Sequence, residues 1–283
     1  MLIARTVAEL RHHLSAFKQP VFVPTMGNLH EGHLNLLRLA KPLGDVTVTS
    51  IFVNRLQFLP HEDFASYPRT FDSDCQQLQA HACDVLFAPD ETQLYPHPQT
   101  FKVQPDPALA NILEGEFRPG FFTGVCTVVL KLFHCVFNGG AGVAVFGQKD
   151  YQQQLILKHM VQQLAMPIDI VTAATTRAPD GLALSSRNGY LSPPERAEAV
   201  QLSVALNTLA QAVRAAKAGG LFDVLAAEKN AMQALVSRGW QPDYVSLRHS
   251  HDLSAVTAVG DQAMVVLGAA KLGKTRLIDN VEI

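Results

Sequence analysis

The chain has 283 residues, of which 48% are hydrophobic and 17% charged, a composition that excludes a disordered protein and allows one large or two ordinary domains. Its 23 basic and 25 acidic residues give a formal net charge of −2 without any basic run, so no nucleic-acid-binding surface is expected. The longest apolar stretch, 124–137, contains Lys131 and His134 and is too short to span a bilayer.

The cysteines and the N-terminus are those of a protein that is not exported. The first ten residues lack a basic segment followed by an apolar one, so no signal peptide is predicted. No two cysteines form a Cys-x-x-Cys pair, which argues against a zinc ribbon or a redox dithiol. We therefore expect a cytoplasmic protein without membrane contact, with reduced and mostly buried thiols at Cys75, Cys83, Cys126 and Cys135.

Short apolar runs alternate with segments of helical periodicity over the first 175 residues. The predicted strands are 21–23, 46–53, 84–88, 141–146 and 168–171. The first predicted helix begins at His33 and ends before Gly44. Three further helices are predicted over 71–83, 125–136 and 151–164. Alternation of strands and helices at this spacing predicts an α/β domain with a doubly wound parallel sheet.

The alternation ends near residue 175. Two helices in succession are then expected, followed by three strands, and this order does not fit a β-α-β repeat. The predicted ranges are 193–218 and 221–237 for the helices, 244–247, 263–267 and 276–278 for the strands, and 271–274 for a hairpin turn. We therefore expect a first domain over 1–175 and a smaller α+β domain over 176–283.

The segment 24–33, Pro-Thr-Met-Gly-Asn-Leu-His-Glu-Gly-His, connects the first predicted strand to the first predicted helix. Ligands gather at the carboxyl ends of strands in open α/β sheets, and a helix N-terminus suits phosphate. His30 and His33 are three residues apart and can both donate hydrogen bonds to charge that develops during group transfer. Polar capping of the helix explains the same pair without a ligand. The spacing does not match the His-Glu-x-x-His zinc motif, so no metal site is predicted.

Three further segments place polar side chains at strand or loop ends, and each has a structural alternative. Lys149, within 146–150, could contact phosphate or belong to a solvated helix start. The residues 185–187, Ser-Ser-Arg, resemble an anion clamp or a polar interdomain loop. Asn54 and Gln57 follow a buried strand, where their amides could orient a small polar substrate or cap the strand end.

Taken together and in this order, these segments resemble the pantothenate synthetase (pantoate–β-alanine ligase) family. That family belongs to a His-x-x-His nucleotidyltransferase superfamily related to class I aminoacyl-tRNA synthetases. Each motif is weak alone, whereas the combination is specific. The matching stretches are PTMGNLHEGH at 24–33, SIFVN-x-x-QF at 50–58, YPRT at 67–70, RPG-x-F-x-GV at 118–125, TVVLKLF at 127–133, FGQKDYQQ at 146–153 and DGLALSSRNGYLS at 180–192.

The resemblance implies an ATP-dependent ligase that condenses D-pantoate with β-alanine through a pantoyl adenylate, releasing AMP and pyrophosphate. It also implies a Rossmann-like N-terminal domain, a smaller C-terminal lid and a homodimer. Mg²⁺ would be carried mainly by the triphosphate, so no residue is assigned as a metal ligand, although Asp72 and Asp74 are nearby acidic candidates.

The resemblance also assigns roles to individual residues. The implied catalytic residues are His33, usually assigned as the proton donor, with His30, Lys149, Ser186 and Arg187. The implied ATP-binding residues are Met26, Gly27, Asn28, Leu29, His30, Glu31, Gly32, His33, Gly147, Gln148, Lys149, Asp150, Thr176, Leu184, Ser185, Ser186 and Arg187. The residues implied for pantoate and β-alanine are Gln57, Gln153 and Asn54.

Three positions depart from the family pattern. Arg55 replaces a usual proline, and this change predicts a looser turn at Asn54 and Gln57. Phe121 replaces a usual histidine, and Gln148 replaces a common glutamate. Two alternatives stay open: another adenylyl- or cytidylyltransferase of the same superfamily, and a nucleotide-binding regulatory protein without catalysis.

Overall fold

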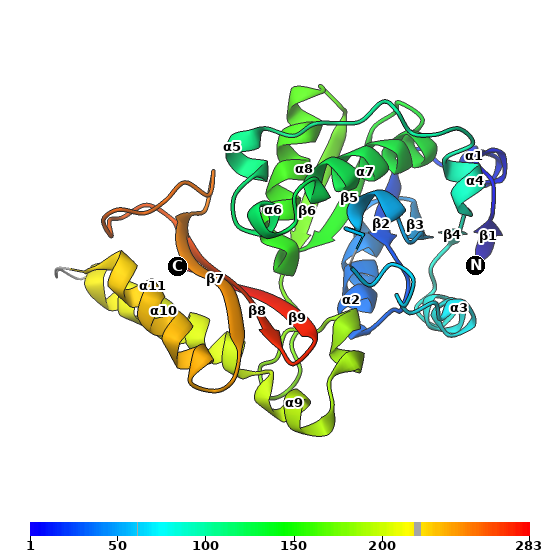
Figure 1. Cartoon of the computed structure of the whole chain (residues 1–283). Coiled ribbons are helices and arrows are strands. Elements are labelled where there is room, and N and C mark those ends of the chain that lie inside the picture. Colours follow the sequence, from blue (N-terminus) through cyan, green and yellow to red (C-terminus); the bar gives the residue numbers. More distant parts are fainter. Residues whose placement is uncertain (61, 218–221) are drawn as a thin grey trace. The chain divides into compact units, whose positions relative to one another are not determined.

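The structure is a computed structural model, and the residues that it describes are 1–60, 62–217 and 222–283. The chain divides into two compact units (Figure 1). The first unit holds Met1–Gln148 and Ile156–Ala174, and the second unit holds Lys149–Leu155 and Thr175–Ile283. Within the described ranges, no helix is both long and apolar enough to cross a membrane.

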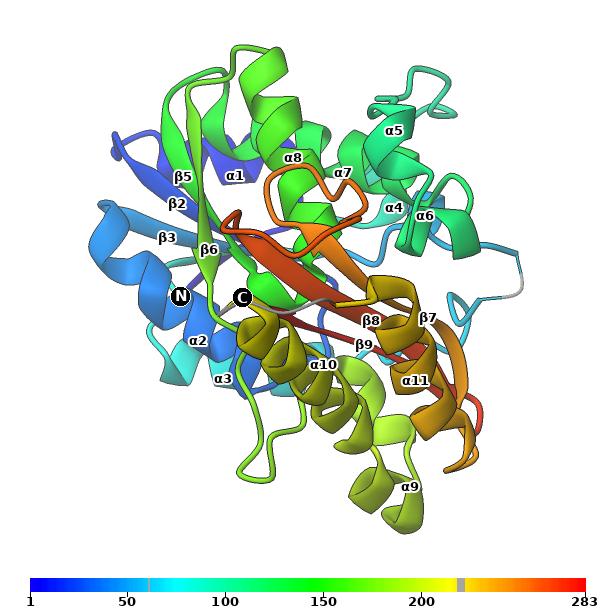
Figure 2. The same cartoon turned by 90° about the vertical axis from the view of Figure 1, so that its left-hand side faces the viewer.

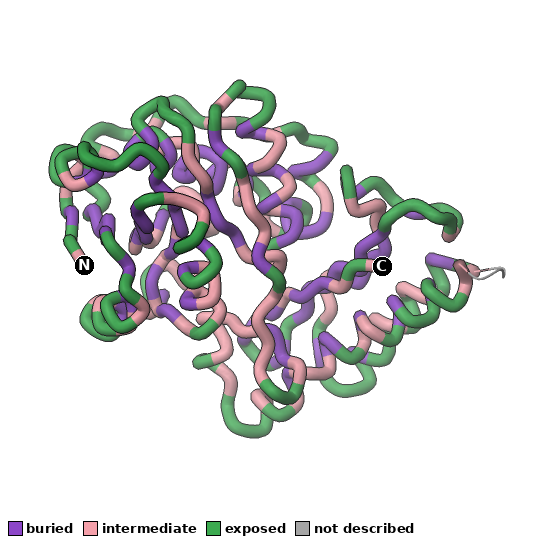
Figure 3. Tube along the Cα trace, turned by 180° about the vertical axis from the view of Figure 1, so that it is seen from behind, coloured by how far each residue is buried: buried purple, intermediate pink, exposed green. Residues whose placement is uncertain are grey.

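The first unit is built on a parallel sheet with the strand order β1-β4-β3-β2-β5-β6 (Figure 1). Its central strands are almost entirely buried, as expected for a parallel sheet with helices on both faces (Figure 3). The strands are β1 (Leu2–Ala4), β2 (Pro20–Thr25), β3 (Val46–Ile51), β4 (Val85–Phe87), β5 (Gly142–Gly147) and β6 (Ile168–Ala173). The predicted doubly wound α/β fold is confirmed.

Helices cover both faces of this sheet, and Figure 2 shows α1 and α2 on opposite sides of it. Right-handed crossovers account for this, because the chain moves along the sheet in one direction from β2 to β4 and in the other from β5 to β6. The helices and 3₁₀ turns are α1 (Val7–Leu14), α2 (Glu31–Ala40), η1 (Lys41–Leu43), η2 (Arg55–Gln57), α3 (Phe71–Ala80), α4 (Glu91–Leu94), α5 (Pro107–Ala110), α6 (Glu114–Phe117), α7 (Phe121–Phe137), η3 (Gln148–Asp150) and α8 (Tyr151–Gln163).

The switch point of the sheet lies between β2 and β5, where ligands bind in open α/β folds. The oxygen of Thr25 accepts from the Phe52 amide at 3.1 Å, so by alternation Pro24 faces β5 rather than β3. Pro24 has no N–H group, and β2 pairs with β5 only at Val21 and Phe22. The ladder between these strands therefore ends before the carboxyl end of β2.

The second unit contains a three-stranded antiparallel sheet in the order β7-β8-β9. The hairpin turn is confirmed: Leu272 pairs with Thr275, which leaves Gly273 and Lys274 as a two-residue loop. A core around Trp240, Leu206 and Val266 joins the helices to the sheet. The elements are η4 (Ser186–Tyr190), α9 (Pro193–Glu198), α10 (Gln201–Lys217), α11 (Val224–Val236), β7 (Gln241–His249), β8 (Met264–Leu272) and β9 (Thr275–Glu282).

Two features differ from the sequence expectations. The helix expected over 193–218 is two helices, α9 and α10, and the turn between them leaves Glu198 bonded to Arg238 and Trp240. Periodicity misses such a break because one or two turn residues barely change the apolar pattern. The short elements β1, α1, α4, α5 and α6 were not predicted from the sequence. The predicted helix ends at 218 and 221 lie outside the described residues.

The cysteines are free thiols, three of them buried and Cys75 half-buried. Burial raises the pKa of Cys126 to about 12 and raises the pKa of Cys83 and Cys135 as well. These thiols are therefore protonated at neutral pH and poorly suited to act as nucleophiles.

Candidate active site

The turn after β2 is fixed by a buried carboxylate. Gly27 and Asn28 adopt φ angles of 81° and 50°, and a side chain on Gly27 would place Cβ 3.0 Å from Asp74 Oδ2. Asp74, on α3, is 1% exposed and accepts the amides of Asn28 and Leu29 at 2.9 and 2.8 Å. Its Oδ2 also accepts from Thr70 Oγ1 at 3.1 Å. The carboxylate thereby holds the backbone that leads into α2.

Asp74 was one of two acidic candidates for a metal site, and its oxygens are instead bonded to protein donors. The other, Asp72, is exposed on the same helix. In the part of the chain that the structure describes, three or more histidine, cysteine or acidic side chains do not gather into a metal-binding group.

His30 and His33 cap the first turn of α2. His30 Nδ1 accepts from the Gly32 amide at 3.1 Å, and His33 Nδ1 accepts from the His30 amide at 3.3 Å. The two rings stack with centroids 4.1 Å apart. Because both Nδ1 atoms act as acceptors, the proton of each neutral ring is assigned to Nε2. The capping role and the proposed chemical role thus use opposite nitrogens of the same rings.

Asn54 and Gln57 border the same turn from β3. Asn54 caps η2 and is 1% exposed, and its Nδ2 donates to Gln57 Oε1 at 3.1 Å. Gln57 Nε2 in turn donates to Met26 Sδ at 3.3 Å. Gly124 lets α7 approach η2 closely, because a Cβ at this position would lie 2.1 Å from Leu56 O. The structure therefore brings Met26, Asn54 and Gln57 together at the carboxyl end of the sheet.

Two of the unusual residues make compensating contacts. Arg55 bonds both oxygens of Glu91 at 3.1 and 3.2 Å, and its guanidinium lies over the Phe64 ring. The turn that was expected to be looser is therefore tied to α4 by a side chain that proline lacks. Arg118 lies 3.8 Å from the centroid of the Phe121 ring. Arg118 also pairs with Glu62 and donates to Gln57 O at 3.2 Å.

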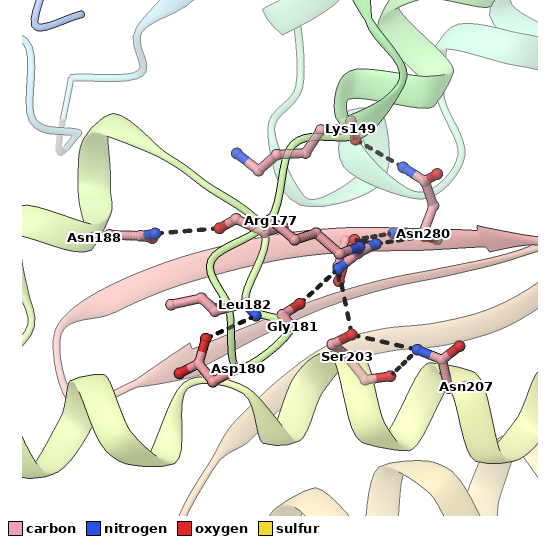
Figure 4. Close-up of polar contacts among 11 residues, drawn as sticks. Lys149, Arg177, Asp180, Gly181, Leu182, Asn188, Ser203, Asn207 and Asn280 are labelled. Carbon is pink, nitrogen blue, oxygen red and sulfur yellow. Dashed lines mark hydrogen bonds and ion pairs between the residues drawn. The ribbon is translucent and has the colours of Figure 1, made fainter. Parts of the chain in front are cut away.

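The second unit contributes the loop between Thr176 and Arg187. The Leu184 amide donates to Thr176 O at 3.0 Å, so these two predicted ATP-binding residues are neighbours. Ser185 caps η4 by accepting the Arg187 amide at 3.2 Å. Asn188 Nδ2 donates to Ala183 O at 3.1 Å and closes the loop (Figure 4). These bonds present the backbone of 184–187 as one compact turn.

A buried network on β9 holds this loop and Lys149 (Figure 4). Arg177 makes two bonds to Asp279, at 2.7 and 2.8 Å, and also donates to Gly181 O. The next residue, Asn280, donates from Nδ2 to Lys149 O at 2.9 Å. Asp279 and Asn280 are each 4% exposed. One pair of adjacent residues on β9 therefore anchors both of the predicted phosphate-binding segments of the second unit.

Two buried oxygens near this network lack a hydrogen-bond partner among the described residues. They are Thr175 Oγ1, beside Thr176, and Asn188 Oδ1, at the end of the loop. Unsatisfied buried polar atoms are uncommon in folded proteins and require an explanation. Their position in the two segments predicted to hold a nucleotide is consistent with a ligand-binding loop.

The predicted site residues divide between the two units. The first unit contains Met26 to His33, Asn54, Gln57, Gly147 and Gln148. The second unit contains Lys149, Asp150, Gln153, Thr176 and Leu184 to Arg187. Gln153 is half-buried near the start of α8. The sequence analysis did not anticipate Arg177, Asp279 and Asn280, because nothing in the local sequence relates β9 to residues more than a hundred positions earlier.

Comparison with known proteins gives consistent results. A family model described as pantoate-beta-alanine ligase matches residues 2–282. The chain is 62% identical to a pantothenate synthetase of Verminephrobacter eiseniae over 283 residues, which covers 100% of both chains. It is 40% identical to the crystal structure of pantothenate synthetase from Thermus thermophilus, with a TM-score of 0.88 and 99% of each chain covered. It is 32% identical to pantoate-beta-alanine ligase from Francisella tularensis in complex with beta-gamma ATP and beta-alanine, with a TM-score of 0.77 and 99% and 97% covered.

Proposed function

The chain belongs to the pantoate-beta-alanine ligase family, and from this premise we propose which of its residues carry out each step of the reaction. The enzyme is an amide-forming ligase that joins D-pantoate to β-alanine with ATP and releases AMP and pyrophosphate. Family membership across the whole chain favours this activity over the other transferases of the superfamily and over a regulatory protein without catalysis.

The reaction has two chemical steps. The carboxylate of pantoate attacks the α-phosphate of ATP, pyrophosphate leaves, and pantoyl adenylate forms. The amine of β-alanine then attacks the acyl carbon, the bond between that carbon and the phosphate oxygen breaks, and AMP leaves as the new amide nitrogen releases a proton. Charge accumulates on the phosphate oxygens in the first step, so fixed donors and cations stabilise that transition state most.

His30 and His33 stabilise the phosphates of ATP. Their Nδ1 atoms are bonded to the backbone, so each ring offers an Nε2 proton as a donor. Asp74 positions the turn before them, and the Asn28–Leu29 backbone together with the start of α2 binds nucleotide. His33 acts as the principal donor in adenylate formation. The main support for this assignment is that both rings accept a backbone amide at Nδ1, which assigns the proton of each neutral ring to Nε2.

Lys149, Ser186 and Arg187 supply charge and donors from the second unit. The backbone of Thr176 and Leu184 contacts the nucleotide, supported by the compact turn that their hydrogen bond closes. Gln57 and Gln153 bind pantoate, and Gln57 also lies near β-alanine. All hydrogen-bonding positions of Asn54 face the protein, so Asn54 acts by holding Gln57.

The remaining assignments concern the setting of the reaction. Mg²⁺ bound to the triphosphate would neutralise part of its charge, and no side chain of this protein is assigned to hold the ion. We propose that the residues 176–283 form a lid domain over a nucleotide- and pantoate-binding domain of residues 1–175, and that closure keeps water from the adenylate. The protein works as a homodimer in the cytoplasm.

One assay tests the proposed activity. Purified protein is incubated with ATP, Mg²⁺, D-pantoate and β-alanine, and AMP and pantothenate are measured. We expect equal amounts of both products, with each substrate required. Pyrophosphate release with pantoate but without amide formation would assign a different acceptor. A nucleotide-linked product without amide would instead identify a transferase, and ATP binding without turnover would support the regulatory alternative.

A further inference from the structure

Tyr95, directly after α4, is fixed at the end of a hydrogen-bond chain that leads to Gln57. Its hydroxyl lies 3.0 Å from Asn54 Oδ1. Its ring packs against the Phe52 ring, with centroids 5.8 Å apart. Lys131, on α7, places its Nζ 4.7 Å from the centroid of the Tyr95 ring. The segment after β3 and helix α7 therefore hold the tyrosine in place, and none of the reaction steps above uses it.

The orientation of the Asn54 amide is determined by its neighbours. Gly124 O lies 3.2 Å from Asn54 Nδ2, and a carbonyl oxygen can only accept, so the NH₂ group must face it. The opposite atom, Oδ1, then faces Tyr95, whose hydroxyl must be the donor. The Leu56 amide reaches the same oxygen at a longer distance of 3.4 Å. A rotated amide would place Oδ1 against Gly124 O and leave the Tyr95 proton without its acceptor.

The orientation of Asn54 in turn determines that of Gln57. Asn54 donates its second amide proton to Gln57 Oε1, so Oε1 faces Asn54 and the NH₂ group of Gln57 faces the other way. That NH₂ group points to Met26 Sδ at 3.3 Å. A thioether is a weak acceptor, so a carboxylate or hydroxyl oxygen of a substrate would be a better partner for this NH₂ group.

We propose that Tyr95 is a positioning residue that acts together with Gly124 O: the two hold the Asn54 amide in one orientation, and Asn54 in turn keeps the Gln57 NH₂ group available to an acceptor oxygen of pantoate. The inference rests on the proposed contact between Gln57 and pantoate. The pKa of Tyr95 supports it, because burial and the negative charge of Glu91 raise that pKa well above its usual range. The hydroxyl therefore keeps its proton and remains a donor at any pH at which the enzyme would be assayed.

The test is a double-mutant cycle with Tyr95→Phe and Gln57→Ala. Tyr95→Phe removes one oxygen and leaves the ring contacts. We expect the KM for pantoate to rise about tenfold, the scale of one lost hydrogen bond, while the KM for ATP stays within about twofold. In the Gln57→Ala background, the same substitution should leave the KM for pantoate unchanged, because no amide polarity remains to be fixed.

Tyr151→Phe is the control, since Tyr151 is a buried tyrosine that donates its hydroxyl to a backbone oxygen, Ser250 O, at 3.2 Å. It should lower the melting temperature as Tyr95→Phe does without changing the KM for pantoate. If Tyr95→Phe has no effect on that KM, or the same effect with and without Gln57, the positioning role is wrong. If Gln57→Ala itself leaves the KM for pantoate unchanged, the proposed pantoate contact fails, and the role of Tyr95 fails with it.

Discussion

The two units hold their parts of the site in different ways. In the first unit, the His30–His33 turn and Gln57 are fixed by polar side chains nearby, chiefly Asp74 and Asn54. In the second unit, Lys149 and the loop before Arg187 are anchored by β9, through Asp279 and Asn280. In the first unit, Asp74 holds the backbone of a turn and Asn54 holds a side chain, Gln57, whereas β9 holds the backbone of segments far away in the sequence. Substitutions should therefore affect specific kinetic constants in the first unit and stability or a whole reaction step in the second.

The largest effect is expected at His33. His33→Ala should slow adenylate formation by roughly 10²–10³-fold, because it removes a donor that acts in the transition state. Pyrophosphate release in a single turnover measures this step directly. His12→Ala, an exposed histidine on α1, is the control and should keep the wild-type rate. A His33→Ala enzyme with near-normal release would show that the ring serves only as a helix cap.

The buried pair on β9 should dominate the stability of the second unit. Asp279→Asn removes the negative charge of an ion pair that has two hydrogen bonds and in which the Asp279 side chain is 3% exposed. The substitution should lower the free energy of unfolding by about 3 kcal/mol. Denaturant titration measures this. The exposed pair between Asp180 and Arg196 is the control, and Asp180→Asn should cost less than about 1 kcal/mol. Equal losses for the two variants would contradict the special role of β9.

Asn280 tests whether β9 affects chemistry as well as stability. Asn280→Ala removes the donor to Lys149 O and should slow adenylate formation about tenfold, in line with one lost hydrogen bond. Asn280→Asp, which has no NH₂ group, should not restore the rate. Asn207→Ala removes a comparable bond on α10, to Ser203 O, and serves as the control. If preformed pantoyl adenylate is used equally slowly by Asn280→Ala, its effect is not on the first step.

The smallest effect is expected at Arg55. Arg55→Pro loses an ion pair whose side chains are 60% and 49% exposed, and gains the stiffness of proline at the first position of a short helical turn. These effects oppose each other, so the free energy of unfolding should change by less than about 1 kcal/mol. The KM for pantoate should change less than about twofold. A large rise in this KM would show that the Arg55–Glu91 contact is needed to orient Gln57.

The sequence predicted what is encoded locally. The strands near Val46 and Ile168, the hairpin at Gly273 and the motif around His30 depend on the periodicity and turn chemistry of neighbouring residues, and the structure contains them. The strand predicted at 21–23 is longer in the structure, Pro20–Thr25. Its ends contain Pro20 and Pro24, and prolines normally argue against a central strand.

Contacts between distant segments were not predictable from the sequence. Tyr95 and Asn54 are 41 positions apart, and Arg177 and Asp279 are 102 positions apart. Polar partners of this kind have no periodicity, since their pairing follows from sheet order and crossover connections. The sequence therefore indicated candidate residues for substrate binding, while the residues that hold these candidates in place became visible only in the folded chain.

Pro24 limits the pairing of β2 with β5 because proline has no backbone N–H group. The pairing of β2 with β5 stops at Phe22, and the amide proton that would continue the ladder at Pro24 is missing from the backbone. Any other amino acid at this position would restore an amide proton directed at β5. In evolutionary terms, a single substitution at Pro24 would extend the pairing of β2 with β5 toward the carboxyl end of the sheet, even if every candidate site residue were retained.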